Sequence, residues 1–394
     1  MFDVIFSVAL ALIFARIIGY LFDRFKQPAV IGEIIAGLIL GSVGLIILYG
    51  QQFTFFNLTI KLPELTYATP EFELLAELGI LFLLFISGLE IRISRLRKVG
   101  KTSSFVAIGG AMMPLFFGIL IGLYFSFTLQ ESIVIGLILI ATSVGVTVRT
   151  LMDFHILDTD VGATVLGGAV IDDIFGIILL AFVLGIESPL WIGIKVVIFF
   201  LIFLYLGLKV IDKILDIGEK IHLPKAFLSI SLSIFLIYSF FADNAGIAGI
   251  IGAFVAGILI GQTVRSSKII SDVKTIGYGF FIPLFFVWVG SKVNIYAFLS
   301  IGFFAISIII VSIIGKIIGC GFGAKLAGLT NRESVQVGIG MIPRMELSLI
   351  IVTSFISNGI LTGNVADQIL ATTLLLTFVT TLITPFLIKI VFKI

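Results

Sequence analysis

Charged residues and cysteine are scarce in this sequence of 394 residues, and each scarcity excludes a class of protein. Asp, Glu, Lys and Arg make up 12% of the chain, about half the share that is usual in soluble domains. The single cysteine, Cys320, excludes a scaffold held together by disulfides. The net charge is only +2, which gives no basic surface for nucleic acid. Soluble enzymes, disulfide-rich domains and nucleic-acid-binding proteins are therefore excluded.

Apolar residues, by contrast, make up 59% of the chain, and the mean hydropathy is +1.26. Such a composition belongs in a lipid bilayer. A helix needs about 20 apolar residues to cross roughly 30 Å of hydrocarbon, so this length allows roughly a dozen crossings joined by short loops. We therefore expect an all-α membrane protein with little left over for a soluble domain.

Thirteen apolar segments, separated by charges, prolines or turn residues, are predicted to cross the membrane. The first begins with Met1-Phe2-Asp3 and lacks the basic residues of a secretory signal, so we interpret it as a retained span. The predicted segments are 2–22, 28–49, 71–91, 103–127, 131–151, 160–185, 189–211, 225–242, 245–263, 275–291, 296–326, 334–357 and 365–390.

The distribution of Lys and Arg predicts the orientation of these segments. If the amino terminus is outside, nineteen of the 25 basic residues, Arg149 among them, fall in cytoplasmic loops or at the carboxyl end, and only Lys61 and Lys292 fall outside. Cytoplasmic loops are the ones enriched in Lys and Arg. We therefore predict an external amino terminus and a cytoplasmic carboxyl terminus in the cell membrane.

A short sequence occurs twice. Residues Ile31–Gly41 of the second segment and Ile251–Gly261 of the ninth are identical at five of eleven positions. Both carry a Gly-xxx-Gly spacing, which lets helices approach each other closely.

A second pair of similar sequences is separated by the same seven segments. Gly145 and Arg149, four residues apart in the fifth segment, match Gly340 and Arg344 in the twelfth. A shift by an odd number of crossings inverts the direction through the membrane. We therefore predict two inverted six-helix repeats, joined by the seventh segment, as is characteristic of secondary transporters.

Five ionisable residues fall deep inside predicted segments, where charge is costly and usually functional. Asp172 and Asp173 lie about halfway along the sixth segment, Lys316 is deep in the eleventh, and Arg344 and Glu346 are near the middle of the twelfth. Adjacent helical residues point about 100° apart, so the two aspartates can do different work. One can bind an ion while the other meets a cation such as Lys316. The alternative is a buried ion-pair cluster that only fixes helix packing.

For Arg344 and Glu346 the sequence favours a structural role. Two residues apart on a helix, their side chains diverge, so we expect each to have its own partner. Glu33, Glu77 and Glu90 are candidate partners.

Two segments contain interruptions. Thr142–Thr147 interrupts the fifth and Gly338–Pro343 the twelfth, where proline removes an amide donor. Unwound backbone at this depth is tolerated only where it lines a cavity or is buried in protein. Its carbonyls and the hydroxyls of Thr142 and Ser143 would suit a dehydrated monovalent cation. A simple kink, with the hydroxyls bonded back to the helix, is the alternative.

The small residues Gly319, Gly321 and Ala324 formally match a dinucleotide-binding pattern. No strand precedes them, and the spacing fits close helix packing better.

Seven motifs in chain order resemble those of the monovalent cation:proton antiporter superfamily, and the resemblance covers almost the whole chain. The motifs are Gln27–Glu33 with Ala36-Gly37, Glu77–Phe85 with Gly88–Glu90, Ala141–Gly145, Asp172-Asp173, Pro283–Phe286 with Gly290, Gly315–Gly319, and Pro343–Glu346. The tandem aspartates are similar to those of electrogenic NapA-like sodium/proton antiporters. One departure is Met345, where the family pattern has Gly.

The resemblance implies roles for these residues. Asp173 would be the ion-binding carboxylate, with Asp172 paired to Lys316, and Thr142 and Ser143 would lie where two broken helices cross. It also implies a homodimer formed through 1–102 and 225–295, an ion-transport core made of 103–188 and 296–394, and a connecting helix in 189–224.

The expected activity is therefore the exchange of Na⁺, or also Li⁺, for H⁺ without any cofactor. A buried carboxylate can be neutralised by a proton or by a metal ion but not by both at once. If cation binding also releases a proton from Lys316, two protons move per Na⁺ and transport by an elevator-like shift is electrogenic. The alternatives are K⁺/H⁺ exchange, a sodium-coupled organic-anion symporter and a cation channel.

Overall fold

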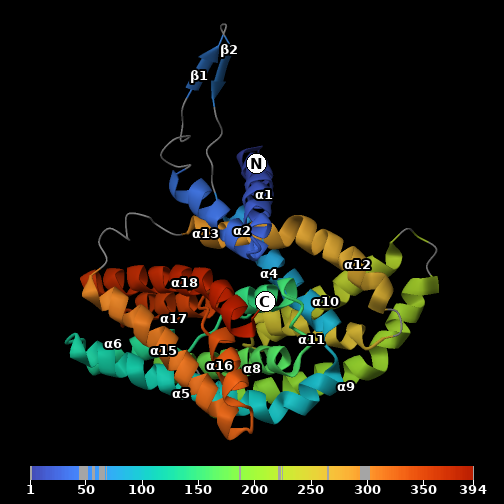
Figure 1. Cartoon of the computed structure of the whole chain (residues 1–394). Helices are drawn as coiled ribbons and strands as arrows, with labels where there is room; N and C mark the ends of the chain where they lie inside the picture. Colours follow the sequence, from blue (N-terminus) through green and yellow to red (C-terminus); the bar gives the residue numbers. More distant parts are fainter. Residues whose placement is uncertain are drawn as a thin grey trace. The chain divides into compact units, whose positions relative to one another are not determined.

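The fold is almost entirely helical in the part of the chain that the structure, a computed structural model, describes (Figure 1). The described residues are 2–43, 52–55, 58–61, 67, 69–185, 188–220, 223, 225–263, 266–292 and 302–393. Parts of two predicted segments, 44–49 and 296–301, lie outside them.

The described helices include nine that are long and apolar enough to cross a membrane and four shorter apolar ones. The long ones are α1 (Phe2–Arg24), α4 (Pro70–Glu90), α5 (Ile93–Tyr124), α8 (Asp160–Leu184), α9 (Pro189–Lys220), α10 (Ala226–Asn244), α15 (Phe303–Leu326), α18 (Gly363–Phe392), and the run of α12 (Ser266–Ile276), η2 (Gly277–Phe281) and α13 (Ile282–Ser291). The short ones are α2 (Ala29–Leu38) with η1 (Ile39–Val43), α6 (Leu129–Ile138), α11 (Gly249–Gly261) and α17 (Glu346–Ser357), and two further short helices are α7 (Val144–Asp153) and α16 (Asn331–Gly340).

Each of the thirteen predicted segments holds one of these long or short apolar helices, so the prediction of a multi-pass helical membrane protein is confirmed. Several boundaries were wrong in the same way. Helix α5 begins at Ile93 rather than at 103, and α9 continues to Lys220 rather than ending at 211. Lys and Arg are good helix formers, so the helices continue into stretches that hydropathy assigned to loops.

One hairpin departs from the all-α prediction. Strands β1 (Gln52–Phe55) and β2 (Leu58–Lys61) pair antiparallel, with Gln52 opposite Lys61 and Phe55 opposite Leu58. The segment contains aromatic and Thr residues that favour strands. Hydropathy analysis indicated only that this stretch was not a span.

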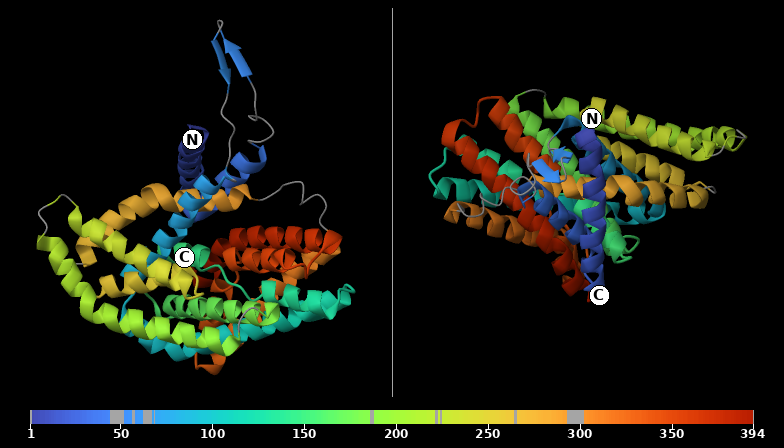
Figure 2. Two further views of the ribbon diagram at one scale, coloured as in Figure 1. Left: turned by 180° about the vertical axis from the view of Figure 1, so that it is seen from behind. Right: turned by 90° about the horizontal axis from the view of Figure 1, so that it is seen from above.

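The chain divides into two compact units. The first comprises 1–82 and 274–300, and the second comprises 83–273 and 301–394. In the first unit, α1, α2 and α13 pack against one another. Figure 2 gives two further views, in which α1 is dark blue and α13 is orange. The second unit contains all five ionisable residues predicted for the site, Asp172, Asp173, Lys316, Arg344 and Glu346.

Close glycine contacts confirm the internal repeat. A methyl group added at Gly290 on α13 would meet the backbone of Ile34, Gly37 and Leu38 on α2. In the second unit, a methyl group at Gly88 on α4 would meet the backbone of α11 at the three positions that the Ile31/Ile251 alignment makes equivalent: Phe254, Gly257 and Ile258. The second helix of each repeat thus packs against the third helix of the other.

Within the second unit, α5 packs lengthwise against α8 and α15, and Figure 1 shows α17 and α18 above α5. The approach of α5 to α15 depends on small residues. A side chain at Gly109 or Gly319 would overlap the carbonyl oxygen of the other, and one at Gly323 would overlap that of Phe105. The packing interpretation of the Gly319–Ala324 pattern is therefore confirmed.

The fifth and twelfth segments are both broken helices. Helix α6 ends at Ile138 and α7 begins at Val144, while α16 ends at Gly340 and α17 begins at Glu346. The breaks are displaced by a few residues from the predicted interruptions, 142–147 and 338–343. Glycines 145, 338 and 340 lie within α7 and α16 rather than in the breaks. At Gly338 a methyl group would overlap the backbone of Ile317 on α15, so close helix packing requires a small residue there.

Both broken segments begin with the same capping device. The Thr128 hydroxyl accepts from the Glu131 amide and the Glu131 carboxylate accepts from the Thr128 amide, and Thr330 and Glu333 repeat this arrangement. Hydrogen bonds from the Thr330 hydroxyl and amide lower the pKa of the Glu333 carboxyl. These boxes fix the start of each segment.

The capping boxes also correct the register of the repeat. Thr128 aligns with Thr330, and this register places Val144, the first residue of α7, opposite Glu346, the first of α17. The predicted match of Gly145 with Gly340 was wrong, because Gly145 lies after one break and Gly340 before the other. The pairing of the fifth segment with the twelfth was right.

Candidate ion-binding site

The two broken helices cross at their breaks. The Ser143 amide donates to the Pro343 carbonyl at 2.7 Å and the Thr147 hydroxyl to the Gly340 carbonyl at 2.7 Å. The Ser348 hydroxyl donates to the Ile138 carbonyl at 3.0 Å. As the residue number rises in one segment it falls in the other, so the segments run antiparallel, as inverted repeats require.

Asp172 on α8 is held at this crossing. Its Oδ2 accepts from Lys316 Nζ on α15 and from the Thr142 hydroxyl, each at 2.6 Å. Asp172 and Lys316 are completely buried, and Thr142 is 3% exposed. Within the described part of the chain, Oδ1 of Asp172 accepts no hydrogen bond. The structure thus contains the ion pair that the resemblance implied, and the pair leaves one carboxylate oxygen available.

Asp173, the next residue of α8, points to a different neighbourhood. It lines a small cavity and is 4% exposed. The other residues around this cavity are apolar side chains from α4, α7, α8 and α11: Leu84, Val144, Val170, Ile250, Ile251 and Phe254. The two carboxylates therefore have separate surroundings, as expected for adjacent residues on one helix.

Arg344 lies in the break and not on a helix, which corrects the expectation that it shares a helix with Glu346. Its side chain is completely buried. The guanidinium donates to the Ala141 carbonyl in the opposite break and, through Nε, to the Ser312 hydroxyl at 3.1 Å. The Ala141 carbonyl lies beyond the C-terminus of α6, where the helix dipole is negative, so the cation stabilises the crossing.

Two threonines of α18 hold the backbone of Arg344. Its amide donates to the Thr380 hydroxyl at 3.1 Å, and its carbonyl accepts from the Thr381 hydroxyl at 3.3 Å. These contacts satisfy the backbone groups that lose their helical partners at the break.

Ser143 is fully buried at the crossing. Its hydroxyl donates to the sulfur of Met345 at 3.7 Å, and the Thr381 hydroxyl approaches the same sulfur at 3.8 Å. The hydroxyl protons of Thr142 and Ser143 thus both have acceptors. The oxygen lone pairs, which are what a cation needs as ligands, stay available.

Arg149 and Glu346 both lie on helices in the second unit. Arg149 is not in a loop: it lies on α7, is 6% exposed, and pairs with Asp153 at 2.9 Å. Glu346 begins α17, but its side chain lies outside what the structure describes. The hydrogen bonds described for Arg344 go to uncharged oxygens rather than to Glu33, Glu77 or Glu90.

Sequence reasoning did not single out the hydroxyl residues that support the crossing, which are Ser312, Ser348, Thr380 and Thr381. They lie on apolar helices, where Ser and Thr commonly bond to their own backbone. The clustering of Thr in α18 was the available signal: Thr372, Thr373, Thr377, Thr380, Thr381 and Thr384 are all buried.

Comparison with known proteins agrees with this geometry. The family model described as "Sodium/hydrogen exchanger, transmembrane" matches residues 9–394. The Na⁺/H⁺ antiporter of Enterococcus hirae is 33% identical over 390 residues, which cover 97% of this chain and 96% of the relative. The Na⁺/H⁺-K⁺ antiporter GerN of Bacillus cereus is 32% identical over 399 residues, which cover 99% and 97%.

Among solved structures, the sodium proton antiporter MjNhaP1 of Methanocaldococcus jannaschii superimposes with a TM-score of 0.69. The match covers 98% of this chain and 96% of that one at 17% identity. At this identity the likeness shows the fold alone, which is the antiporter fold with two inverted repeats.

Proposed function

Because this chain belongs to the sodium/hydrogen exchanger family of transmembrane antiporters, we propose that it exchanges Na⁺, or also Li⁺, for H⁺ across the cell membrane. Members of this family are transporters and not enzymes. The observation that carries the proposal is the tandem Asp172-Asp173 beside the crossing of two broken helices, with one carboxylate ion-paired and the other at a cavity.

Exchange follows from competition for the carboxylate of Asp173. A charge buried among apolar side chains is costly. A proton or a metal ion removes this cost, and binding of one displaces the other. The cavity around Asp173 is otherwise apolar, so the neutralised site can move through the membrane more readily than the charged one. The hydroxyl oxygens of Thr142 and Ser143 would supply further ligands for a dehydrated cation.

The pair of Asp172 and Lys316 bears on stoichiometry. A cation that also engages the free Oδ1 of Asp172 would compete with Lys316 for this carboxylate, and a buried lysine without its partner tends to lose its proton. One Na⁺ would then exchange for two protons, one from Asp173 and one from Lys316, so transport would be electrogenic.

The rest of the proposal concerns the movement. Residues 103–188 and 296–394 would form a core that carries the ion by an elevator-type shift. Residues 1–102 and 225–295 would form the dimerisation domain of a homodimer. The amino terminus would lie outside and the carboxyl terminus in the cytoplasm, as the distribution of Lys and Arg predicts.

The test is proton flux in proteoliposomes loaded with a pH-sensitive dye, measured against Na⁺, Li⁺, K⁺ and choline. We expect Na⁺, and Li⁺ if it is a substrate, to drive proton movement that responds to an imposed membrane potential. Transport that ignores the potential would rule out the 2:1 stoichiometry. Sodium flux without a counter-transported proton would indicate a channel, and sodium-driven uptake of an organic anion would indicate a symporter.

A second candidate is K⁺/H⁺ exchange by the same site. It is favoured by the similarity to GerN, a relative whose name includes K⁺. The same cation panel separates the two, because a K⁺ exchanger moves protons in response to K⁺ gradients when Na⁺ is absent.

A further inference from the structure

The amino-terminal end of α5 is strongly basic. Between 92 and 101 the chain has five basic residues, Arg92, Arg95, Arg97, Lys98 and Lys101, and no acid. They surround the start of a helix, where the backbone dipole is also positive. Such a concentration of positive charge needs negative groups close by.

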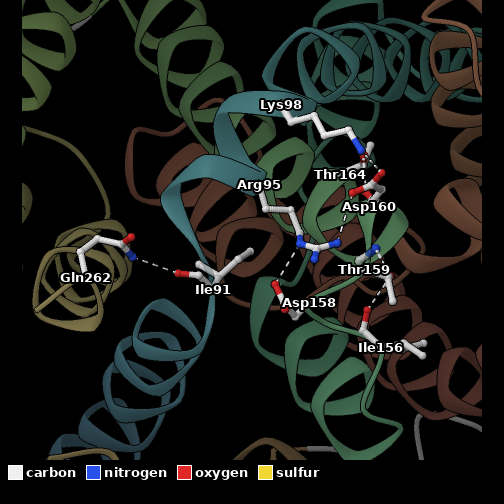
Figure 3. Close-up of polar contacts among 10 residues, drawn as sticks. Ile91, Arg95, Lys98, Ile156, Asp158, Thr159, Asp160, Thr164 and Gln262 are labelled. Carbon is white, nitrogen blue, oxygen red and sulfur yellow. Dashed lines mark hydrogen bonds and ion pairs between the residues drawn. The ribbon is translucent and has the colours of Figure 1, made fainter. Parts of the chain in front are cut away.

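Part of this charge is neutralised within the protein. Arg95 pairs with Asp158 at 3.0 Å and with Asp160 at 3.2 Å, and Lys98 pairs with Asp160 at 2.6 Å. Figure 3 shows Arg95 and Lys98 reaching from α5 toward these two aspartates at the start of α8. Asp158 and Asp160 therefore neutralise only the basic residues Arg95 and Lys98 of α5.

Arg97 and Lys101 lie on another side. They are four residues apart, so they are neighbours on one helix face, and both are exposed. Among the described residues neither has an ion pair or a hydrogen bond, whereas Asp158 and Asp160 pair with Arg95 and Lys98. Their charges are thus open to a ligand from outside the chain.

The face that carries Arg97 and Lys101 continues as an exposed apolar stripe. At intervals of three or four residues it presents Phe105, Ile108, Met112 and Phe116, which are 37%, 51%, 61% and 55% exposed. Exposed apolar side chains on a helix of a membrane protein face lipid chains. The two basic residues therefore stand directly at the end of a lipid-facing surface.

The length of α5 places them at the level of the lipid headgroups. The helix has 32 residues, so it is about 48 Å long, and the hydrocarbon layer is only about 30 Å thick. The stretch from Phe105 to Tyr124 spans about 30 Å by itself. Lys101, about 6 Å before Phe105 along the helix, is then the first basic residue beyond the hydrocarbon, and Arg97 is about 6 Å further out.

We propose that Arg97 and Lys101 form a binding site for the headgroup of an anionic phospholipid, whose acyl chains lie along Phe105, Ile108 and Met112. The chemistry favours an anionic lipid because a zwitterionic headgroup brings its own cation and leaves the two charges uncompensated. Arginine and lysine are also the side chains that bind phosphate best. The site lies on α5, which packs against the helices that carry Asp172 and Lys316.

The test is lipid retention by the purified full-length chain, compared by native mass spectrometry between phosphatidylglycerol and phosphatidylcholine with the same acyl chains. We expect a preference for phosphatidylglycerol that the double variant Arg97→Gln/Lys101→Gln loses. Each basic residue near an anionic surface contributes about fivefold, so the preference should fall about 25-fold. The charge-preserving variant Arg97→Lys/Lys101→Arg should keep it.

The matched control is Lys209→Gln/Lys213→Gln on α9. These lysines are also exposed and four residues apart, but each has an aspartate three residues later on the same helix, Asp212 or Asp216. Their removal should leave the lipid preference unchanged. Equal retention of both lipids by the unaltered chain, or an undiminished preference in the Arg97/Lys101 glutamine variant, would overturn the proposal. The two residues would then serve only to orient the helix in the membrane.

Discussion

The ammonium of Lys316 lies 2.6 Å from Oδ2 of Asp172, and neither side chain has any exposed surface. A buried ion pair of this kind repays the cost of desolvation only while both partners are present. The Thr142 hydroxyl occupies the same oxygen at 2.6 Å, so the pair also links α8 and α15 to the crossing of the broken helices.

Removing Lys316 alone should destabilise the protein more than removing the whole pair. In Lys316→Met an unpaired carboxylate remains buried, which costs about 3–5 kcal/mol. In Asp172→Asn/Lys316→Met neither charge of the pair remains, so much of the loss should be recovered. Thermal unfolding in detergent measures both.

The control is an exposed pair in the same unit. Lys225 lies 2.7 Å from Asp272 with 67% and 32% of the side chains exposed, and Lys225→Met should cost less than about 1 kcal/mol. If the single and double variants at Asp172 and Lys316 melt at the same temperature, the pair does not stabilise the core in this way.

Asp173→Asn should abolish sodium-driven proton flux while the protein still inserts and folds. The amide keeps the size of the side chain but carries no charge, so a proton and Na⁺ can no longer compete for it. Proteoliposome flux checks this, with Asp158→Asn as a control, since Asp158 is 45% exposed and pairs with Arg95 at the surface. If Asp173→Asn retains sodium-driven proton flux, Asp173 is not the ion-binding carboxylate.

The helices and the charged residues could be predicted from the sequence because both follow from simple physical rules. Continuous apolar segments indicate spans, and a residue such as Lys316 inside one of them is conspicuous because charge there is costly. The repeat could also be predicted from the order of the residues, since Gly37 and Gly257 occupy equivalent positions in the two segments and lie at equivalent helix contacts. These signals are local in the sequence.

The register of the breaks could not be predicted in the same way. Glycine and proline indicated that a helix ends, but Gly145 and Gly340 lie within α7 and α16. The hydroxyls of Thr380 and Thr381 bond to Arg344, which is more than thirty residues away. Contacts over such separations leave no mark on periodicity or composition.

Met345→Leu should weaken cation binding without unfolding the protein. Leucine keeps the apolar volume but removes the sulfur that accepts the Ser143 hydroxyl proton at 3.7 Å. The hydroxyl would then turn, and its lone pairs would no longer be directed as before. We expect the KM for Na⁺ to rise about fivefold, the effect of losing one weak hydrogen bond.

Met341→Leu is the matched control for this substitution. Met341 lies in the same break and is likewise completely buried, yet no hydroxyl donates to its sulfur among the hydrogen bonds of the described residues. The KM of the Met341→Leu variant for Na⁺ should therefore stay unchanged. If Met345→Leu and Met341→Leu have the same KM as the unaltered protein, the thioether has no part in orienting Ser143.

Gly319→Ala should separate α5 from α15 and lower both stability and transport. The added methyl group would overlap the carbonyl oxygen of Gly109, and backbone cannot move aside as a flexible side chain can. Overpacking of this kind costs about 1–3 kcal/mol. Gly315→Ala, one turn earlier on α15, is the control because its methyl group would meet Pro114 and Phe117 at ordinary contact distances of 3.4 Å. Melting temperature and proton flux together check the prediction. Equal melting temperatures for the two alanine variants would show that the two helices have room to adjust.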